Sequence, residues 1–449
     1  MHIHLHRVAL CHAERQGFGQ GAGSILLAAE EQERAKEEEQ GNAGGAPAPC
    51  IALFLLLCSF LFLRCAKDGA GPLAEPLPFS MAKSNPMQVY VHYMPWFKSK
   101  EYSGAWGLHW TMRNQNPDRV LPNGNREIAS HYYPLIGPYD SADPDVIDYH
   151  LLLMKYVGVD GILIDWYGSH NVLDYGVNLG NTREIINGAE RVGIRFAIVY
   201  EDASAAEAAR LTGGGDLEAA RADLRYAEQA YFSKEAYLRI GNRPLCLVFG
   251  PRHFKDSTQW KEVLGGLSKP VALYPLWGFS RQVGTSLATG EFAWIDFKPG
   301  FEQLAQFYAS MPKNTSMGAA FPGFHDFYEP GGWGSSYGFI DHRSGATLRA
   351  TLDKARTSGM SQLQLVTWND FGEGTVLEPT QEFGFSSLET IQAFTGVRYT
   401  KADLETIHRY YLKRKELKGN VPAQQSLDVI FQHLVRLDMP AARNALDRL

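Results

Sequence analysis

Cysteine is scarce in the part of this sequence where a folded domain is expected. Four of the five cysteines lie within the first 65 residues, and only Cys246 lies in the later part. A disulfide framework or a cysteine-based zinc site needs several cysteines within one domain. We therefore exclude both for the later part and expect Cys246 to be a small core residue on a strand.

Basic charge and metal-binding motifs are also lacking. The net charge is −6, and no stripe of Lys and Arg stands out. No H-x-H or H-E-x-x-H motif occurs between residues 87 and 395, and no Gly-rich dinucleotide fingerprint follows an early apolar run. We therefore expect no nucleic-acid partner, no cofactor and no metal ion.

No apolar run is long enough to span a bilayer comfortably. The longest, Ile51–Leu63, suits the central region of a signal peptide, and Cys65 follows it closely, as in a bacterial lipoprotein. We interpret residues 1–49 as a disordered or untranslated leader and residues 50–86 as a signal or lipoprotein-like segment with a tether. The prediction is an exported protein, either periplasmic or a membrane-anchored lipoprotein lipidated at Cys65. A short membrane anchor is the alternative.

From residue 87 onward, short apolar runs alternate with helical patterns, which is typical of a parallel sheet with crossover helices. Eight such runs predict a (β/α)8 TIM barrel over residues 87–395, and an open doubly wound sheet is the competing fold. Amphipathic patterns over residues 396–449 predict a short C-terminal helical extension. The eight expected strands are Gln88–Tyr93, Gly161–Trp166, Arg195–Tyr200, Pro244–Phe249, Val271–Leu276, Phe292–Phe297, Met317–Phe321 and Leu363–Trp368.

Polar and aromatic side chains gather where these strands end. In a barrel the carboxyl ends of the strands converge on one face, which is where active sites lie. Aromatic residues also crowd loop-like stretches, and such rings suit stacking against the apolar faces of sugars. The candidate substrate-binding residues that this pattern indicates are Trp96, Tyr167, Glu201 and Asn369.

Two acids follow the last expected strand, in the stretch TWNDFGEGTVLEP (Thr367 to Pro379). A surface turn that keeps Asp370 and Glu373 in water is the simplest explanation of two acids three residues apart. However, Trp368 and Phe371 are costly to expose, and the preceding run is apolar. Two acids at the mouth of a buried strand favour a catalytic pair.

This stretch and SHYYPLIGPYDSADPDVIDYHLLLMKYVGVDGILIDWYG resemble glycoside hydrolase family 99, the endo-α-1,2-mannosidases and mannanases. The resemblance extends from Val89 to Glu378. The family pattern acid-Trp-His-acid-Gly-Thr is matched by Asp370, Glu373 and the Gly374-Thr375 pair, with Phe371 and Gly372 in place of Trp and His. The sequence motif W-N-D-F-G-E also resembles family 71, the α-1,3-glucanases.

The resemblance implies a retaining cleavage of α-mannosides through a 1,2-anhydro sugar. Asp370 is the implied base for the sugar's 2-hydroxyl, and Glu373 is the implied acid and base at the leaving oxygen. The resemblance further implies that Trp166 packs against the glycan, that Tyr93 is the aromatic after the first strand, and that His325 takes the role of a family tyrosine.

The shorter acid leaves alternatives open. Asp370 has one methylene less than the family's Glu, which withdraws its carboxylate by about 1.3 to 1.5 Å. Either the backbone compensates, or the pair holds a water and acts by inversion, as in an α-glucanase. A catalytically decayed barrel that only binds glycans is the alternative from another class. The leading hypothesis is an exported α-mannosidase with a glycan substrate.

Overall fold

The computed structural model describes Phe79 and residues 81–449. The predictions on the leader, on the apolar run Ile51–Leu63 and on Cys65 lie outside the described residues. All described residues belong to one compact unit.

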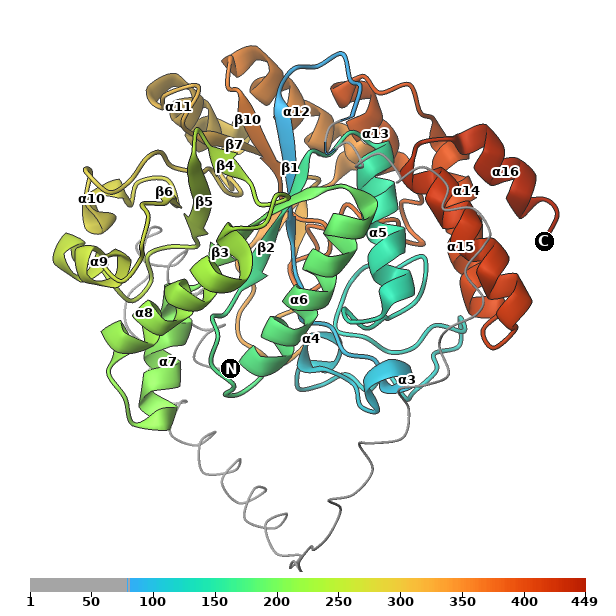
Figure 1. Ribbon diagram of the computed structural model, residues 1–449, viewed down its shortest axis with the longest axis horizontal. Helices are drawn as coiled ribbons and strands as arrows, with labels where there is room; N and C mark the ends of the chain where they lie inside the picture. Colours follow the sequence, from blue (N-terminus) through green and yellow to red (C-terminus); the bar gives the residue numbers. More distant parts are fainter. Residues whose placement is uncertain (1–78, 80) are drawn as a thin grey trace, which may run out of the picture. The chain divides into compact units, whose positions relative to one another are not determined.

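A parallel sheet forms the centre of this unit (Figure 1). Its hydrogen-bonded order is β4-β5-β3-β2-β1-β10-β7, with β6 paired to the other edge of β5. All pairings in it are parallel except that of β4 with β5. β2 and β10 are buried along their whole length, as expected for strands covered on both faces. The strands are β1 (Gln88–Tyr93), β2 (Gly161–Trp166), β3 (Arg195–Tyr200), β4 (Arg239–Ile240), β5 (Arg243–Val248), β6 (Ala272–Pro275), β7 (Met317–Ala320) and β10 (Gln362–Leu365).

Seven of the eight expected strands are confirmed within a few residues, but the prediction of a strand over Phe292–Phe297 was wrong. Only Phe292 forms ladder contacts, as isolated parallel bridges to Leu276 and to Met317. Beyond it, the Ala293 carbonyl accepts from the Gln364 side chain, and the Asp296 carboxylate caps the Lys298 and Leu304 amides. The Gln364 bond thus takes the place of a ladder bond at Ala293, and the Asp296 bonds stabilise the backbone that follows the segment. The eight-stranded closed barrel stays a prediction, because β6 and β7 are joined only through Phe292.

Helices surround the strands (Figure 1). In α5, for example, the Asp143 side chain caps the first turn at the Asp145 amide, and Pro144 occupies the first turn, where its missing N–H costs nothing. The longer helices are α5 (Pro144–Tyr156), α6 (Tyr175–Val192), α7 (Asp202–Thr212), α8 (Asp216–Ala227), α9 (Ser257–Leu264), α11 (Glu302–Ser310), α12 (Ala346–Ser358) and α13 (Ser386–Thr395). Short elements are α3 (Lys100–Ser103), α4 (Leu108–Thr111), η1 (Glu228–Phe232), α10 (Ser280–Val283), η2 (Pro299–Phe301), η3 (Arg343–Gly345) and the β8 (Phe324–His325) and β9 (Phe339–Ile340) hairpin.

Three helices form the predicted C-terminal extension: α14 (Lys401–Glu416), α15 (Val421–Val435) and α16 (Met439–Leu446). They pack beside α5. The buried Lys155 ammonium donates to the carbonyls of Val192 and Val435, which lie at the ends of α6 and α15. The Tyr156 hydroxyl donates to the carbonyl of Leu434.

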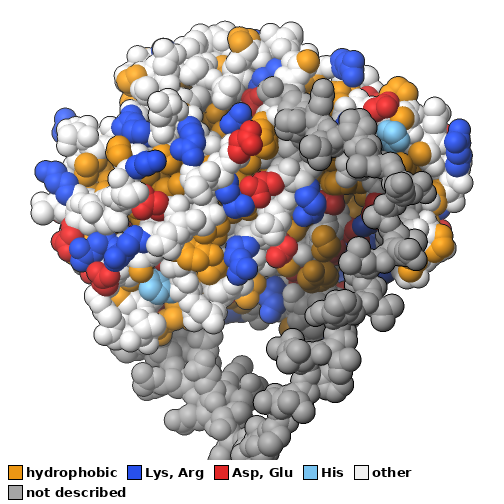
Figure 2. All heavy atoms as spheres, in the orientation of Figure 1, with side chains coloured by type: hydrophobic (Ala, Val, Ile, Leu, Met, Phe, Trp, Pro, Cys, Tyr) orange, Lys and Arg blue, Asp and Glu red, His pale blue; other side chains and the backbone are white. Residues whose placement is uncertain are grey.

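On the face shown in Figure 2, acidic and basic side chains are interspersed. Arg221, for instance, contacts both Glu218 and Glu262. Within the described residues, no helix combines the length and apolarity that crossing a bilayer requires.

Candidate active site

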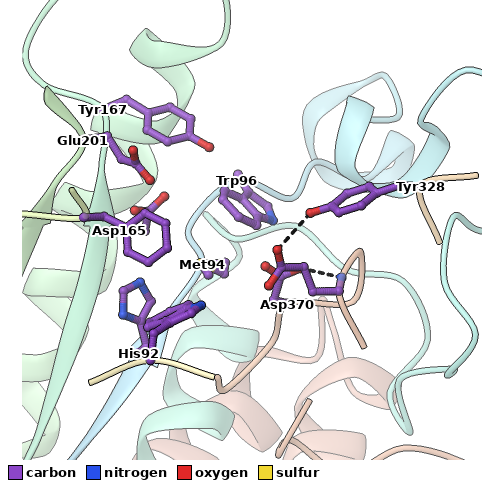
Figure 3. Close-up of a pocket in the computed structure, with 11 residues that line it drawn as sticks. His92, Met94, Trp96, Asp165, Tyr167, Glu201, Tyr328 and Asp370 are labelled. Atoms are coloured by element: carbon purple, nitrogen blue, oxygen red, sulfur yellow. Dashed lines mark hydrogen bonds between the residues drawn. The ribbon is translucent and has the colours of Figure 1, made fainter. Parts of the chain in front are cut away.

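A pocket lies where β1, β2, β3 and β5 end, beside the turn that follows β10 (Figure 3). About 420 Å³ of space between atoms lies within it, part of which is open to solvent. Four carboxyl groups and several aromatic rings line it, an unusual combination for a buried volume. The lining residues are His92, Met94, Trp96, Asp165, Tyr167, Glu201, Phe249, Trp294, Tyr328, Asp370 and Glu373.

The two predicted catalytic acids sit on one turn that is closed by its own hydrogen bonds. The Asp370 amide donates to Thr367 Oγ1 at 2.8 Å, and the Thr367 amide donates to the Thr375 carbonyl at 2.9 Å. Gly374 has φ +66°, and a Cβ there would lie 2.5 Å from the His325 carbonyl oxygen. Only glycine fits this position, so the turn presents both acids to the pocket.

The surroundings of Asp370 and Glu373 raise the pKa of one acid more than that of the other. Burial raises the pKa of Asp370 to about 7, although the Glu373 amide, which donates to Asp370 Oδ1 at 2.9 Å, favours the ionised form. Burial and the neighbouring Asp370 charge raise the pKa of Glu373 well above its usual range, and the Tyr328 hydroxyl donates to Glu373 Oε1 at 3.2 Å. Asp370 therefore ionises before Glu373.

A second pair of acids, Asp165 and Glu201, lines the same pocket. Burial raises the pKa of Glu201 to about 8, while the nearby Arg252 guanidinium opposes this shift. Burial and then the Glu201 charge raise the pKa of Asp165 well above its usual range. Figure 3 shows Asp165, Glu201 and Tyr167 on one side of the pocket, with Asp370 and Tyr328 across from them.

Trp96 provides an aromatic surface between these two sides. Its indole ring stacks on the His109 imidazole with centroids 4.1 Å apart and an interplanar angle of 6°. His109 Nε2 in turn lies 3.6 Å from the Asp174 carboxylate, which holds the imidazole in place. A ring fixed on one face in this way suits stacking of a sugar on the other.

The structure brings five of the predicted site residues together in the pocket: Trp96, Tyr167, Glu201, Asp370 and Glu373. The other four lie outside its lining, and no finding tests their predicted roles in binding.

Tyr93 and Trp166 are buried beside the pocket. The Tyr93 hydroxyl lies 2.9 Å from His150 Nδ1, and Trp166 is fully buried against the rings of Tyr200 and Tyr231.

His325 and Asn369 support the turn that carries the acids. The His325 amide donates to the Glu373 carbonyl, and its ring stacks on His131 with centroids 3.6 Å apart. Asn369 bonds both backbone groups of Met94 and the Tyr139 hydroxyl.

The sequence analysis missed several residues that line the pocket, although Asp165 was among the polar residues at strand ends. His92 and Met94 alternate with Trp96, so a period of two along the first strand could have indicated them. Phe249 directly follows β5. Trp294 and Tyr328 lie in irregular segments, where no periodicity shows which way a side chain points.

In the described part of the chain, no three or more His, Cys, Asp or Glu side chains are grouped so that they could hold a metal ion.

We predict that Asp370→Asn stabilises the protein at alkaline pH. Because the pKa of Asp370 is raised on folding, the folded state binds more protons between about pH 4 and 7, and stability falls as pH rises through that range. Asparagine carries no charge and can still accept from the Glu373 amide. At pH 8 the free energy of unfolding in urea should rise by more than about 1 kcal/mol, since one pKa unit corresponds to about 1.4 kcal/mol.

The exposed Asp353→Asn serves as the matched control and should leave the pH dependence of stability unchanged. An Asp370→Asn protein no more stable than the wild type at pH 8 would contradict the raised pKa.

One segment of the chain is similar to a known protein family. Residues 85–272 match the sequence profile of Glycosyl hydrolase family 99. Over this segment the chain is similar to glycoside hydrolase family 99. The matched segment of this family 99-like chain covers β1 and β2 with the Asp165-Trp166-Tyr167 strand end, and it stops before the turn with Asp370 and Glu373.

Curated relatives are similar to a part of the chain. The glycoprotein endo-alpha-1,2-mannosidase of Rattus norvegicus is 27% identical over 113 residues, which cover 22% of this chain and 24% of the relative. A glycoprotein endo-alpha-1,2-mannosidase-like protein of Danio rerio is 28% identical over 88 residues, covering 18% and 20%. The family 99-like chain thus spans about a quarter of the length of the curated relatives it matches.

The fold is shared over a longer range. The GH99 endo-alpha-mannosidase from Bacteroides thetaiotaomicron superposes with a TM-score of 0.53 at 18% identity, covering 72% of this chain and 98% of that chain. At this identity the likeness concerns the fold alone.

Proposed function

We propose that the protein is a glycoside hydrolase that cleaves α-mannosidic linkages in glycans, with Asp370 and Glu373 as its catalytic pair. One observation carries the proposal: two buried acids share one turn in an aromatic pocket, and their surroundings separate their protonation. Such a split is how glycosidases obtain an acid and a base from two carboxyl groups. The names of the curated relatives support mannose as the sugar.

In the proposed mechanism, Asp370 removes the proton of the sugar's 2-hydroxyl while O2 attacks C1. Glu373 protonates the departing oxygen and then activates the water that opens the 1,2-anhydro ring, while Asp370 returns its proton to O2. In an α-mannoside O2 and the leaving group are both axial and antiparallel, so this attack comes from the required side. In an α-glucoside O2 is equatorial, which disfavours the route.

The first-formed anomer tests this route against the inverting alternative. Hydrolysis of an aryl α-mannobioside, followed by NMR from the first minutes, should give the α-product. A β-product would favour a water-mediated inversion, in which the two carboxyl groups stand about 6.5 to 9.5 Å apart. Wild-type protein that binds α-mannosides but cleaves neither glycans nor activated glycosides would support the glycan-binding alternative.

We predict an acidic limb in the pH–rate profile with an apparent pKa near 7. Asp370 must be ionised to act as a base, so kcat/KM for an activated aryl α-mannoside should fall about tenfold per pH unit below that value. Glu373→Gln should keep this limb with the same substrate. A rate that stays constant between pH 5 and 7 would exclude Asp370 as the base.

Two further proposals concern fold and location. We propose that the chain forms a closed (β/α)8 barrel over residues 87–395, supported by the bridges of Phe292 to both neighbours. We also propose export as a bacterial lipoprotein with membrane attachment through Cys65, which fatty-acid labelling of the wild type and Cys65→Ser would test.

A further inference from the structure

Two polar atoms in the pocket have no hydrogen-bond partner in the protein: Asp165 Oδ2 and His92 Nδ1. Both residues line the pocket, and their exposed fractions are only 2% and 1%. A buried polar atom left without a partner costs about 1 to 3 kcal/mol, so each such atom in a native protein calls for an explanation. These two point to a polar ligand or an ordered water in the pocket.

The sheet register places the two residues on one wall. His92 lies opposite Leu163 in the parallel pairing of β1 with β2, and Asp165 follows Leu163 by two residues. Because side chains alternate along a strand, Asp165 and His92 project from the same face of the sheet. Glu201 joins this wall by the same reasoning, since Asp165 pairs with Val199, two residues before it. Figure 3 shows this wall across from Asp370 and Tyr328.

The charges around Asp165 decide what the wall can bind. Burial raises the pKa of Asp165, and the groups whose charge acts on it, Glu201, Asp370 and Asp174, are all acids and raise it further, so its surroundings favour the protonated form. Arg252, the cation beside Glu201 and Glu373, is not among them. A protonated carboxyl offers one O–H donor and an acceptor oxygen.

His92 is neutral as well, because burial lowers its pKa to about 3. Its ring, packed edge-on against Trp294 and in contact with the Gln364 side chain, carries one donor and one acceptor nitrogen. Neutral groups that both donate and accept suit the hydroxyl groups of an uncharged sugar.

We propose that Asp165 and His92 form a hydroxyl-binding wall that holds the reacting sugar opposite the Asp370–Glu373 pair, and that Asp165 does so in its protonated form. This inference rests on the proposed function. It makes the two residues determinants of specificity for a neutral hexose, while bond cleavage is left to the other pair.

The test compares two substitutions of nearly the same volume. Asp165→Asn keeps a donor and an acceptor and should retain kcat/KM for an aryl α-mannoside within about threefold. Asp165→Leu removes both and should lower kcat/KM by about 10- to 100-fold, the usual range for a lost hydrogen bond to such a group. Ile164→Val, on the opposite face of the same strand, should change little.

Monodeoxy substrates identify the hydroxyl that is bound. For the 3-, 4- and 6-deoxy mannosides, the wild type should lose about 10- to 100-fold at one position. With that deoxy substrate, Asp165→Leu should have the same kcat/KM as the wild type. His92→Phe should behave in the same way with the substrate that lacks the neighbouring hydroxyl. In variants that fold normally, the loss from the substitution and the loss from the missing hydroxyl could instead be fully additive at every position. That result would overturn the proposal and mean that the two atoms bind ordered water. Loss of activity in Asp165→Asn equal to that in Asp165→Leu would overturn the protonated form.

Binding measurements keep this test separate from the proposed function. The affinities of methyl α-mannoside and its deoxy analogues, measured by calorimetry, should show the same coupling, which is the non-additivity between a substitution and a missing hydroxyl. This measurement does not require that the protein hydrolyses glycosides. Absence of turnover with intact coupling would defeat the proposed hydrolysis alone. Turnover without coupling would defeat the wall alone.

Discussion

Asp370→Asn should lower kcat for hydrolysis of α-mannosides by about 10²- to 10⁴-fold, the usual contribution of a positioned acid or base. The loss should be the same for poor and good leaving groups. In the proposed mechanism no other group takes the proton from the 2-hydroxyl, and cleavage of every substrate requires the attack of O2 on C1.

Glu373→Gln should behave differently. A natural glycan leaves as an alkoxide unless it is protonated, so turnover of glycans should fall by a similar factor. A nitrophenolate leaves without protonation, so an activated aryl α-mannoside should be spared in part, with the remaining loss due to the slower opening of the anhydro ring. The ratio of the two rates, measured for each variant, separates the acid from the base.

The exposed Glu389→Gln provides the control for loss of an acidic side chain, and it should act as the wild type on both substrates. If Glu373→Gln loses both substrates equally while Asp370→Asn spares the aryl glycoside, the two roles are reversed. If neither variant loses activity, the catalytic pair lies elsewhere in the pocket.

Trp166→Ala should lower the free energy of unfolding by about 3 to 5 kcal/mol, the usual cost of truncating a buried aromatic side chain. Trp166 is fully buried against Tyr200, Tyr226 and Tyr231, and its removal leaves a cavity that these rings cannot fill without moving. Urea unfolding at pH 7 measures the loss, and Trp166→Phe should lose less because it keeps one ring.

Trp96→Ala is the informative counterpart, because the Trp96 ring faces the pocket. It should weaken binding of α-mannosides by about 1 to 3 kcal/mol, if stacking on sugars resembles stacking on bases. Its effect on stability should be smaller than that of Trp166→Ala. If Trp166→Ala remains as stable as the wild type and loses binding instead, that result would support the binding role implied by the family resemblance.

The contrast between these two tryptophans shows what the sequence could predict about this fold. Apolar runs such as those of β2 and β3 gave correct strand positions, because buried parallel strands have few polar residues to obscure them. The acids at the strand ends were found for the same reason, since a charge directly after such a run stands out.

The direction of each side chain was harder to predict. Trp166 and Tyr167 are adjacent, and in an extended chain neighbours point to opposite sides. A run apolar at every position does not say which of the two faces the pocket. Phe292–Phe297 resembled a strand in composition, but the Gln364 side chain satisfies the Ala293 carbonyl there, and such a long-range bond leaves no local pattern.

The bonds of Asn369 have a consequence for the energetics of the reaction. Its amide group links the backbone of Met94, just after β1, to the turn that carries Asp370, and both bonds to Met94 are buried. The acids and the first strand's pocket residues therefore move as one body. Their alignment is established when the chain folds, so little reorganisation remains when a sugar arrives, and the pocket's dipoles already point where charge will develop.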